Sequence, residues 1–220
     1  MKLARLHNLA DIEPYWHVHL ALIIAIALQL GLSDKLTIGP KYWIAGFEVL
    51  LIIALAITVK RGHRVFKHIR RAMAIVLIAI ISAANIVSLV LVINDLFNSK
   101  QISGKELIIS GLAIYVTNII IFGVWYWELD SGGSQELNIN YASIDFLFPQ
   151  MTAKSSVSTL DNWKPTFFDY LYVSITNAVA FSPTDTMPLT HRAKALMGLQ
   201  SAVSLTTIAL VAARAVNILV

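Results

Sequence analysis

The sequence predicts an all-α membrane protein with five transmembrane helices. Hydrophobic residues make up 57% of the 220 residues and charged residues only 14%, which lies outside the range of soluble globular domains. Five apolar segments are long enough to cross a bilayer, which takes about twenty residues. The only long polar stretch, residues 128–165, separates the fourth apolar segment from the fifth.

The five predicted spans differ in length and in their flanking residues. The first is the shortest, and the fifth is long enough to cross with a tilt. Aromatic residues flank the first, second and fourth spans, as is typical of membrane interfaces; they are Tyr15, Trp16, Tyr42, Trp43, Trp125, Tyr126 and Trp127. The spans are expected at residues 18–32, 42–59, 72–93, 107–127 and 193–220.

Basic residues indicate the orientation of the chain. Six of them lie between the second and third spans, and they are Lys60, Arg61, Arg64, Lys67, Arg70 and Arg71. Short basic loops stay on the cytoplasmic side. Counting alternate crossings from this loop places the N-terminus and residues 128–188 in the cytoplasm. We interpret the N-terminus as flanking a retained first span, since no small-residue cleavage site follows it.

The polar stretch between the fourth and fifth spans contains a flexible sequence and an aromatic one. Ser131-Gly-Gly-Ser134 is typical of a mobile turn. Residues 139–151 mix aromatic with polar residues. We expect this middle part to lie on the membrane surface.

Residues 169–188, DYLYVSITNAVAFSPTDTMP, carry the most specific pattern. They resemble, without a gap, the pore helix, filter and exit turn of the potassium-channel superfamily, and the residues after them are similar to the inner helix of that family. The family's D-x-L-Y-x-S pattern falls on Asp169, Tyr172 and Ser174, and Thr176 and Asn177 lie in the same expected pore helix.

The resemblance implies a re-entrant pore-like helix and loop between the fourth and fifth spans. It also implies two regions. Residues 1–105 would form an N-terminal three-helix membrane region. Residues 106–220 would form a pore-like module of outer helix, polar loop, pore helix, filter and inner helix.

The filter positions depart from the family's T-V-G-Y-G-D. Here they are Ala180, Phe181, Ser182, Pro183, Thr184 and Asp185. A potassium filter aims backbone carbonyls of four chains at the ion, and its glycines permit the backbone angles that this requires. Ser182 and Thr184 carry a Cβ, and Pro183 has a locked φ and no amide hydrogen. We therefore infer pore-loop ancestry without ordinary potassium selectivity.

Two alternatives stay open for this stretch. Ser-Pro-Thr-Asp is also typical of a turn before a helix, with Asp185 or Thr186 as N-cap and Pro188 in the first turn. The orientation is the second open point. A potassium channel carries its filter loop on the outer side, whereas the charge rule places this loop inside. We favour the charge rule for the orientation. Either the hairpin is then inverted, or one apolar segment is a re-entrant or interfacial helix that does not cross the membrane.

Polar residues within the spans suggest further sites. Glu48 lies inside the second span, where a carboxylate usually faces a cavity or a partner. The alternative is a protonated or helix-bonded glutamate near the interface. Asn85, Asn118 and Gln200 are single amides that we expect to form hydrogen bonds between helices.

Glu128 and Asp130 follow the fourth span directly. Paired acids of this kind bind a divalent cation or attract cations to a vestibule. The alternative is a solvated helix end. The histidines are scattered, and His17 and His19 lie on different helix faces, so we expect no metal site.

Small residues recur at steps of three and four along the fifth span: Ala195, Gly198, Ala202, Thr206, Ala209 and Ala213. Such a stripe lets another helix approach closely. It fits an inner helix at the axis of an oligomer, and it fits packing within one chain.

The resemblance implies an ion-channel-like homo-oligomer, tetrameric if it follows the family, that acts on monovalent cations with poor selectivity or does not conduct. The alternative is a non-conducting membrane scaffold for a protein partner or a lipid. We expect a multi-pass protein of the plasma membrane, the inner membrane of a bacterium, in contact with the lipid bilayer. No cofactor, nucleic acid or enzymatic reaction is expected, because no phosphate-binding loop, nucleophile motif or nucleic-acid patch is present.

Overall fold

The structure, a computed structural model, is mostly helical. It describes residues 16–37, 41–59, 64–98, 103–131, 144–152, 163–180 and 185–219. The helices are α2 (Trp16–Leu30), α3 (Lys41–Val59), α4 (Arg64–Asn98), α5 (Gly104–Ser131), α6 (Pro149–Thr152), α7 (Phe167–Ala180) and α8 (His191–Leu219), with the short 3₁₀ helix η1 (Asp34–Leu36). The strands β1 (Phe146–Leu147) and β2 (Met187–Pro188) pair antiparallel.

Within the described residues, three helices are long and apolar enough to cross a membrane: Ile69–Phe97 of α4, Gly104–Asp130 of α5 and His191–Val216 of α8. The apolar parts of α2 and α3, Trp16–Leu30 and Tyr42–Ile57, are shorter. Each of the five predicted spans therefore falls on a helix. These lengths are consistent with a membrane protein.

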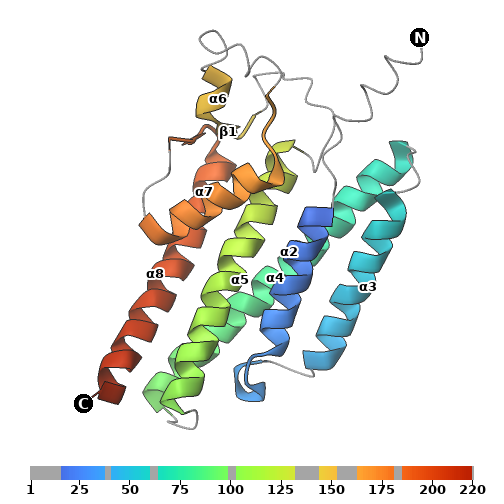
Figure 1. Cartoon of the computed structure of the whole chain (residues 1–220). Coiled ribbons are helices and arrows are strands. Elements are labelled where there is room, and N and C mark those ends of the chain that lie inside the picture. The colour runs from blue at the N-terminus through green and yellow to red at the C-terminus, as the bar shows by residue number, and fades with distance from the viewer. Residues whose placement is uncertain are drawn as a thin grey trace, which may run out of the picture.

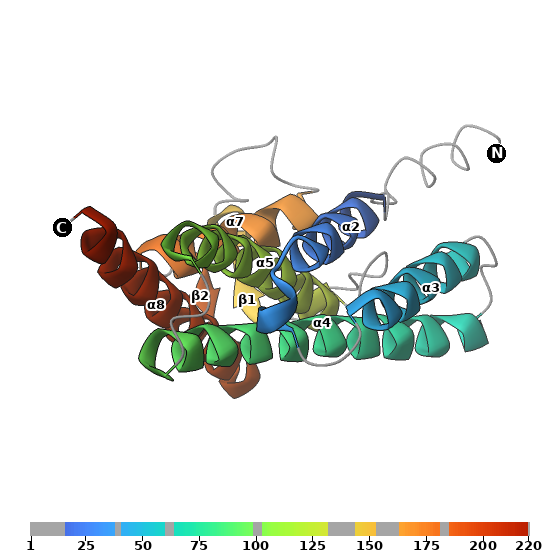
Figure 2. The same ribbon diagram turned by 90° about the horizontal axis from the view of Figure 1, so that it is seen from below.

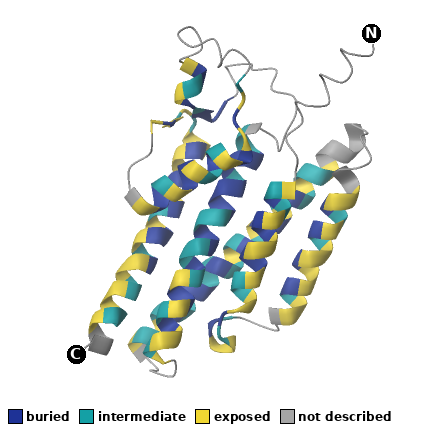
Figure 3. Cartoon of the chain, viewed as in Figure 1, coloured by how far each residue is buried: buried dark blue, intermediate teal, exposed yellow. Residues whose placement is uncertain are grey.

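The helices form a bundle with α5 at its centre. Figure 1 shows α2, α3, α4, α5 and α8 running between the same two ends of the molecule, while the shorter α7 lies obliquely near one end. In the perpendicular view of Figure 2, α4 runs along one side of the bundle. Helix α5 packs against α2, α4, α7 and α8. Its apolar stretch is 61% buried, against 28% for α8, and this difference is visible in Figure 3.

The basic segment differs from the predicted loop. Arg64 begins α4, so Arg70 and Arg71 lie on its first turns. Arginine and lysine are good helix formers, and tertiary packing extends the helix beyond its apolar stretch. Arg70 lies beside Trp127 and Glu128 at the end of α5. The basic start of α4 and the end of α5 are therefore at the same end of the bundle (Figure 1), as alternate crossing predicts.

Two glycines of α5 permit its close packing. A Cβ on Gly111 would collide with the side chain of Val211 on α8. A Cβ on Gly123 would lie 3.1 Å from the Cα of Leu171 on α7, which is tighter than ordinary van der Waals contact. Both positions therefore let a neighbouring helix approach the α5 backbone.

Residues 144–152 of the polar stretch pack into the bundle end, and not on the membrane surface as expected, whereas residues 139–143 lie outside the described residues. Phe146 and Phe148 are buried. The ring of Phe146 lies 5.1 Å from that of Tyr126, and the ring of Phe148 lies 5.2 Å from that of Tyr170. These aromatic pairs bury the segment because its apolar rings face α5 and α7.

The expected aromatic belt at the end of α5 is also wrong. Tyr126 and Trp127 are buried, and the indole nitrogen of Trp125 donates to the Ser82 hydroxyl on α4 at 3.0 Å. Helix α5 is covered on several sides, so these rings contact protein. By contrast, Trp16, Tyr42 and Trp43 are exposed, as interfacial anchors would be.

Helix α8 begins at His191, which excludes the alternative with Pro188 in its first turn. Pro188 lies in β2. The N-cap is Thr190, whose hydroxyl oxygen accepts from the backbone N–H of Ala193 at 3.2 Å. The pairing of β2 with β1 extends the chain past Asp185 and Thr186, so neither residue caps the helix.

Candidate functional site

Helix α7 packs against both α5 and α8. It begins with a cap in which the carboxylate of Asp169 accepts from the Thr166 backbone N–H at 2.7 Å and from the Thr166 hydroxyl at 2.8 Å. A carboxylate in the first turn also complements the helix dipole. The buried face of α7 carries Phe167, Tyr170 and Val173.

The five expected pore-helix residues take different roles. Asp169 caps the helix. Ser174 and Asn177 are buried, and Ser174 donates to a backbone carbonyl of α5 at 2.6 Å. The Thr176 hydroxyl donates within its own helix, at 2.9 Å and 3.0 Å. Tyr172 is 60% exposed, so it lies on the face of α7 that the described part of the chain leaves uncovered.

Gln200 of α8 is the centre of a buried hydrogen-bond network that joins α5, α7 and α8. Its amide nitrogen donates to the Ser174 hydroxyl at 2.7 Å and to the Ser174 carbonyl at 2.9 Å. Its amide oxygen accepts from the Tyr126 hydroxyl at 2.5 Å and from Nδ2 of Asn177 at 2.9 Å. Gln200 is 0% exposed. These four bonds offset the cost of burying its amide.

Two further amides join helices. Asn118 of α5 donates to the Ser204 hydroxyl of α8 at 2.9 Å. Asn85 of α4 donates to the Ile114 carbonyl of α5 at 3.2 Å. Together with Gln200, these are the three amides expected to bond between helices. That expectation is confirmed for each of them.

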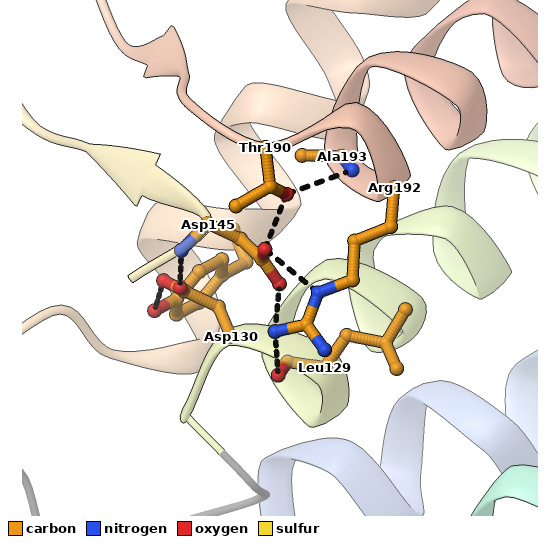
Figure 4. Close-up of polar contacts among 7 residues, drawn as sticks. Leu129, Asp130, Asp145, Thr190, Arg192 and Ala193 are labelled. Atoms are coloured by element: carbon orange, nitrogen blue, oxygen red, sulfur yellow. Dashed lines mark hydrogen bonds and ion pairs between the residues drawn. The ribbon is translucent and has the colours of Figure 1, made fainter. Parts of the chain in front are cut away.

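A second polar cluster closes the end of the bundle above α7 (Figure 4). The buried carboxylate of Asp145 accepts from Nε of Arg192 at 2.8 Å and lies 2.7 Å from its Nη2. It also accepts from the Thr190 hydroxyl, and its backbone N–H donates to Asp130. The Tyr170 hydroxyl donates to the other oxygen of Asp130 at 2.6 Å. The cluster therefore links α5, α7, α8 and the residues just before β1.

Asp130 and Glu128 do not form the expected pair of acids. Asp130 is half-buried, and both of its oxygens accept hydrogen bonds from the chain. Glu128 is fully buried and faces α4, where the charges of Arg70 and Arg71 act on it. The two side chains belong to different environments because they leave α5 in different directions. The burial of Glu128 excludes a solvated helix end at that residue. The expectation that these acids attract cations to a vestibule stays a prediction.

The filter positions are described only at their two ends. Ala180 is the last residue of α7, and Asp185 is exposed. Phe181, Ser182, Pro183 and Thr184 lie outside the described residues.

The small-residue stripe of α8 is exposed. Ala195, Gly198, Ala202, Ala209 and Ala213 are all exposed, and Thr206 is half-buried. A Cβ on Gly198 would meet open space. Packing within the described part of this chain therefore does not account for the stripe.

Glu48 lies away from these two clusters, on α3. It is 0% exposed and faces a cavity between α2, α3 and α4. Among the described residues, no group of histidine and acidic side chains is arranged to hold a metal ion.

Sequence reasoning missed the partnership of Asp145, Thr190 and Arg192. These residues come from chain segments 45 or more positions apart, and no periodic pattern marks Asp145. Comparison with protein-family models, curated proteins and solved structures finds no match to this chain.

Proposed function

We propose that this protein is an ion-channel-like membrane protein that assembles as a homo-oligomer and conducts with poor selectivity or not at all. One observation carries the proposal: α7 is fixed between α5 and α8 by the Gln200 network, while the small-residue face of α8 stays exposed. In a pore hairpin, a short helix is held in place by two helices that cross the membrane, and α7 is held in this way by α5 and α8.

The exposed stripe supports assembly through α8. Small residues allow helix backbones to approach closely in a membrane. The described part of the chain leaves the alanines and Gly198 of this stripe exposed, and only Thr206 is half-buried. Copies of α8 meeting at a symmetry axis would bury them, and four copies would follow the family that the sequence resembles.

The filter residues support the absence of potassium selectivity. Ser182 and Thr184 replace flexible glycines, and Pro183 removes a backbone donor. A loop of this composition does not provide four stacked rings of backbone carbonyls. Conduction, where present, would admit sodium about as readily as potassium.

The proposal includes five crossings of the inner membrane, with α2 and α3 crossing despite their shorter apolar parts. The basic start of α4 and the α7 hairpin would then both face the cytoplasm. The bilayer is the environment that the exposed apolar residues of α3, such as Leu50 and Ile53, require.

Ion flux in proteoliposomes tests the proposal. Purified protein is assayed for sodium and potassium flux, and the reversal potential is measured under bi-ionic conditions. Gly198→Leu, which fills the exposed stripe, should abolish flux, whereas Ala56→Leu on the exposed face of α3 should not. A strong preference for potassium would refute the proposal.

The second candidate is a non-conducting scaffold. An apolar face of α7 that the described part of the chain leaves exposed favours this candidate. The face comprises Phe168, Tyr172, Ile175 and Val179. A protein partner or a lipid would cover such a surface. An oligomer that passes no ion in the flux assay would support this candidate over the conducting form.

A further inference from the structure

A cavity of about 360 Å³ lies between α2, α3 and α4, on helices outside the α5–α7–α8 module. Its volume falls in the range of small-molecule sites, about 300–1,000 Å³. Most of its wall is apolar and includes Leu30, Ile44 and Ile80. The connection between α2 and α3 contributes Leu32 and Thr37.

Among the described residues, Glu48 is the one acidic residue on this wall. It is 0% exposed, and neither of its carboxylate oxygens has a hydrogen-bond partner within the described structure. An unpartnered carboxyl group in an apolar setting is costly, so a donor group is expected to satisfy it.

The other polar groups of the wall do not supply that donor. The amide nitrogen of Gln29 donates instead to the Ile81 carbonyl, at 3.1 Å. The Thr37 hydroxyl donates to the Asp34 carbonyl, also at 3.1 Å. Ser88 also lines the cavity, and it forms no hydrogen bond with Glu48. Among the described residues, the wall therefore supplies no donor to Glu48, and a bound molecule with a donor group would satisfy its carboxyl group.

The chemistry of the wall restricts what that molecule is. A bare divalent cation needs about six to eight oxygen ligands, and the wall offers too few. A carboxylate beside apolar side chains matches an ammonium group on an apolar body, which gives a charge-assisted hydrogen bond together with apolar burial.

We propose that this cavity binds a lipophilic primary amine, with the ammonium group at Glu48 and the apolar chain along Leu30, Ile44 and Ile80. The amine is either a free amphiphile or the headgroup of an ethanolamine lipid, since both present the same donor. The site does not depend on conduction or on the oligomeric state.

Ligand-dependent melting of the purified full-length protein tests the site. The probes are n-octylamine and n-octanol, which share an apolar tail and differ in the head group. Octylamine should raise the melting temperature, because it binds the folded state, and octanol should bind at least about tenfold more weakly. Equal effects of the two probes would overturn the proposal.

Two variants and a matched control locate the binding. Glu48→Gln should weaken octylamine binding by about tenfold, and Ala84→Leu, which fills the cavity from α4, should abolish it while Glu48 is kept. The control is Glu128→Gln, because Glu128 is equally buried and likewise has no hydrogen-bond partner among the described residues, but it faces a cavity of only about 20 Å³. Full binding by either cavity variant would contradict the assignment.

Native mass spectrometry distinguishes the two sources of the amine. An ethanolamine lipid retained by the parent protein and lost from Glu48→Gln identifies the lipid headgroup as ligand. An octylamine effect without a retained lipid identifies a free amine. A neutral lipid retained equally by both proteins, with no preference for octylamine, would refute the site.

Discussion

The carboxylate of Asp145, just before β1, accepts a hydrogen bond from Nε of Arg192 in the first turn of α8 at 2.8 Å. The side chain of Asp145 is 1% exposed, whereas that of Arg192 is 52% exposed. Because Asp145 also donates from its backbone to Asp130 of α5, this pair ties together the elements that surround α7 at the end of the bundle.

Because Asp145 is buried and Arg192 is half exposed, substituting one or the other should change the free energy of unfolding by different amounts. Arg192→Met leaves a buried carboxylate with fewer donors and should lower the free energy of unfolding by about 3 kcal/mol. Asp145→Asn should cost less, since Arg192 remains solvated. Unfolding in mixed micelles of the two single variants and the double variant should give a coupling energy of about 1–2 kcal/mol. Fully additive effects would show that the pair does not couple the two segments.

Gln200→Leu should destabilise the protein more than any other single change to the α5–α7–α8 network. Ser174, Tyr126 and Asn177 would each lose a partner, which we expect to lower the free energy of unfolding by about 2–3 kcal/mol. The control is Thr176→Val on α7, because the Thr176 hydroxyl bonds only within its own helix. Equal melting of the two variants would contradict the central position of Gln200.

Because Thr190 caps α8, substituting Thr190 should destabilise the protein more than substituting Asp185. Thr190→Val removes the acceptor of the Ala193 N–H and a donor to Asp145, so it should cost about 1–2 kcal/mol. Asp185→Ala, at an exposed position, should change stability by less than about 0.5 kcal/mol. Thermal melting of both variants in detergent checks the difference, and a larger effect of Asp185→Ala would restore Asp185 as the cap.

The sequence predicted two kinds of feature: the positions of the long helices, from the length of the apolar segments, and the hydrogen bonds between helices, from single amides within those segments. The five apolar segments predicted the positions of α2, α3, α4, α5 and α8, and Asn85, Asn118 and Gln200 bond between helices as expected. A single amide in an apolar helix has few ways to be satisfied, so its role follows from its surroundings.

Features that depend on contacts between residues far apart in the sequence could not be predicted. Trp127 and Glu128 are buried because α5 is central, and neighbouring helices decide that position. Asp130 looked like a free acid, yet its partners Tyr170 and Asp145 lie 40 and 15 residues away in the chain. Tertiary contacts of this kind leave no periodic trace in the sequence.

Cysteine labelling in intact cells tests the orientation. The sequence has no cysteine, so single substitutions at Ser99, Gly133 and Arg64 can be probed with an impermeant thiol reagent. The charge rule predicts labelling at Ser99 alone. Labelling at Gly133 and Arg64 would reverse the orientation. Labelling of Gly133 and Arg64 from opposite sides would contradict the number of crossings between them.

Distances between copies of Asp185→Cys, measured by pulsed electron paramagnetic resonance on spin-labelled protein in nanodiscs, test the oligomeric pore-like assembly most directly. Asp185 is exposed and follows α7, whose last residue is Ala180. A fourfold assembly predicts two distances between labels, in a ratio of about 1.4 for adjacent and diagonal copies. Dilution with unlabelled protein should weaken this signal. The absence of any distance between copies would contradict the proposed assembly.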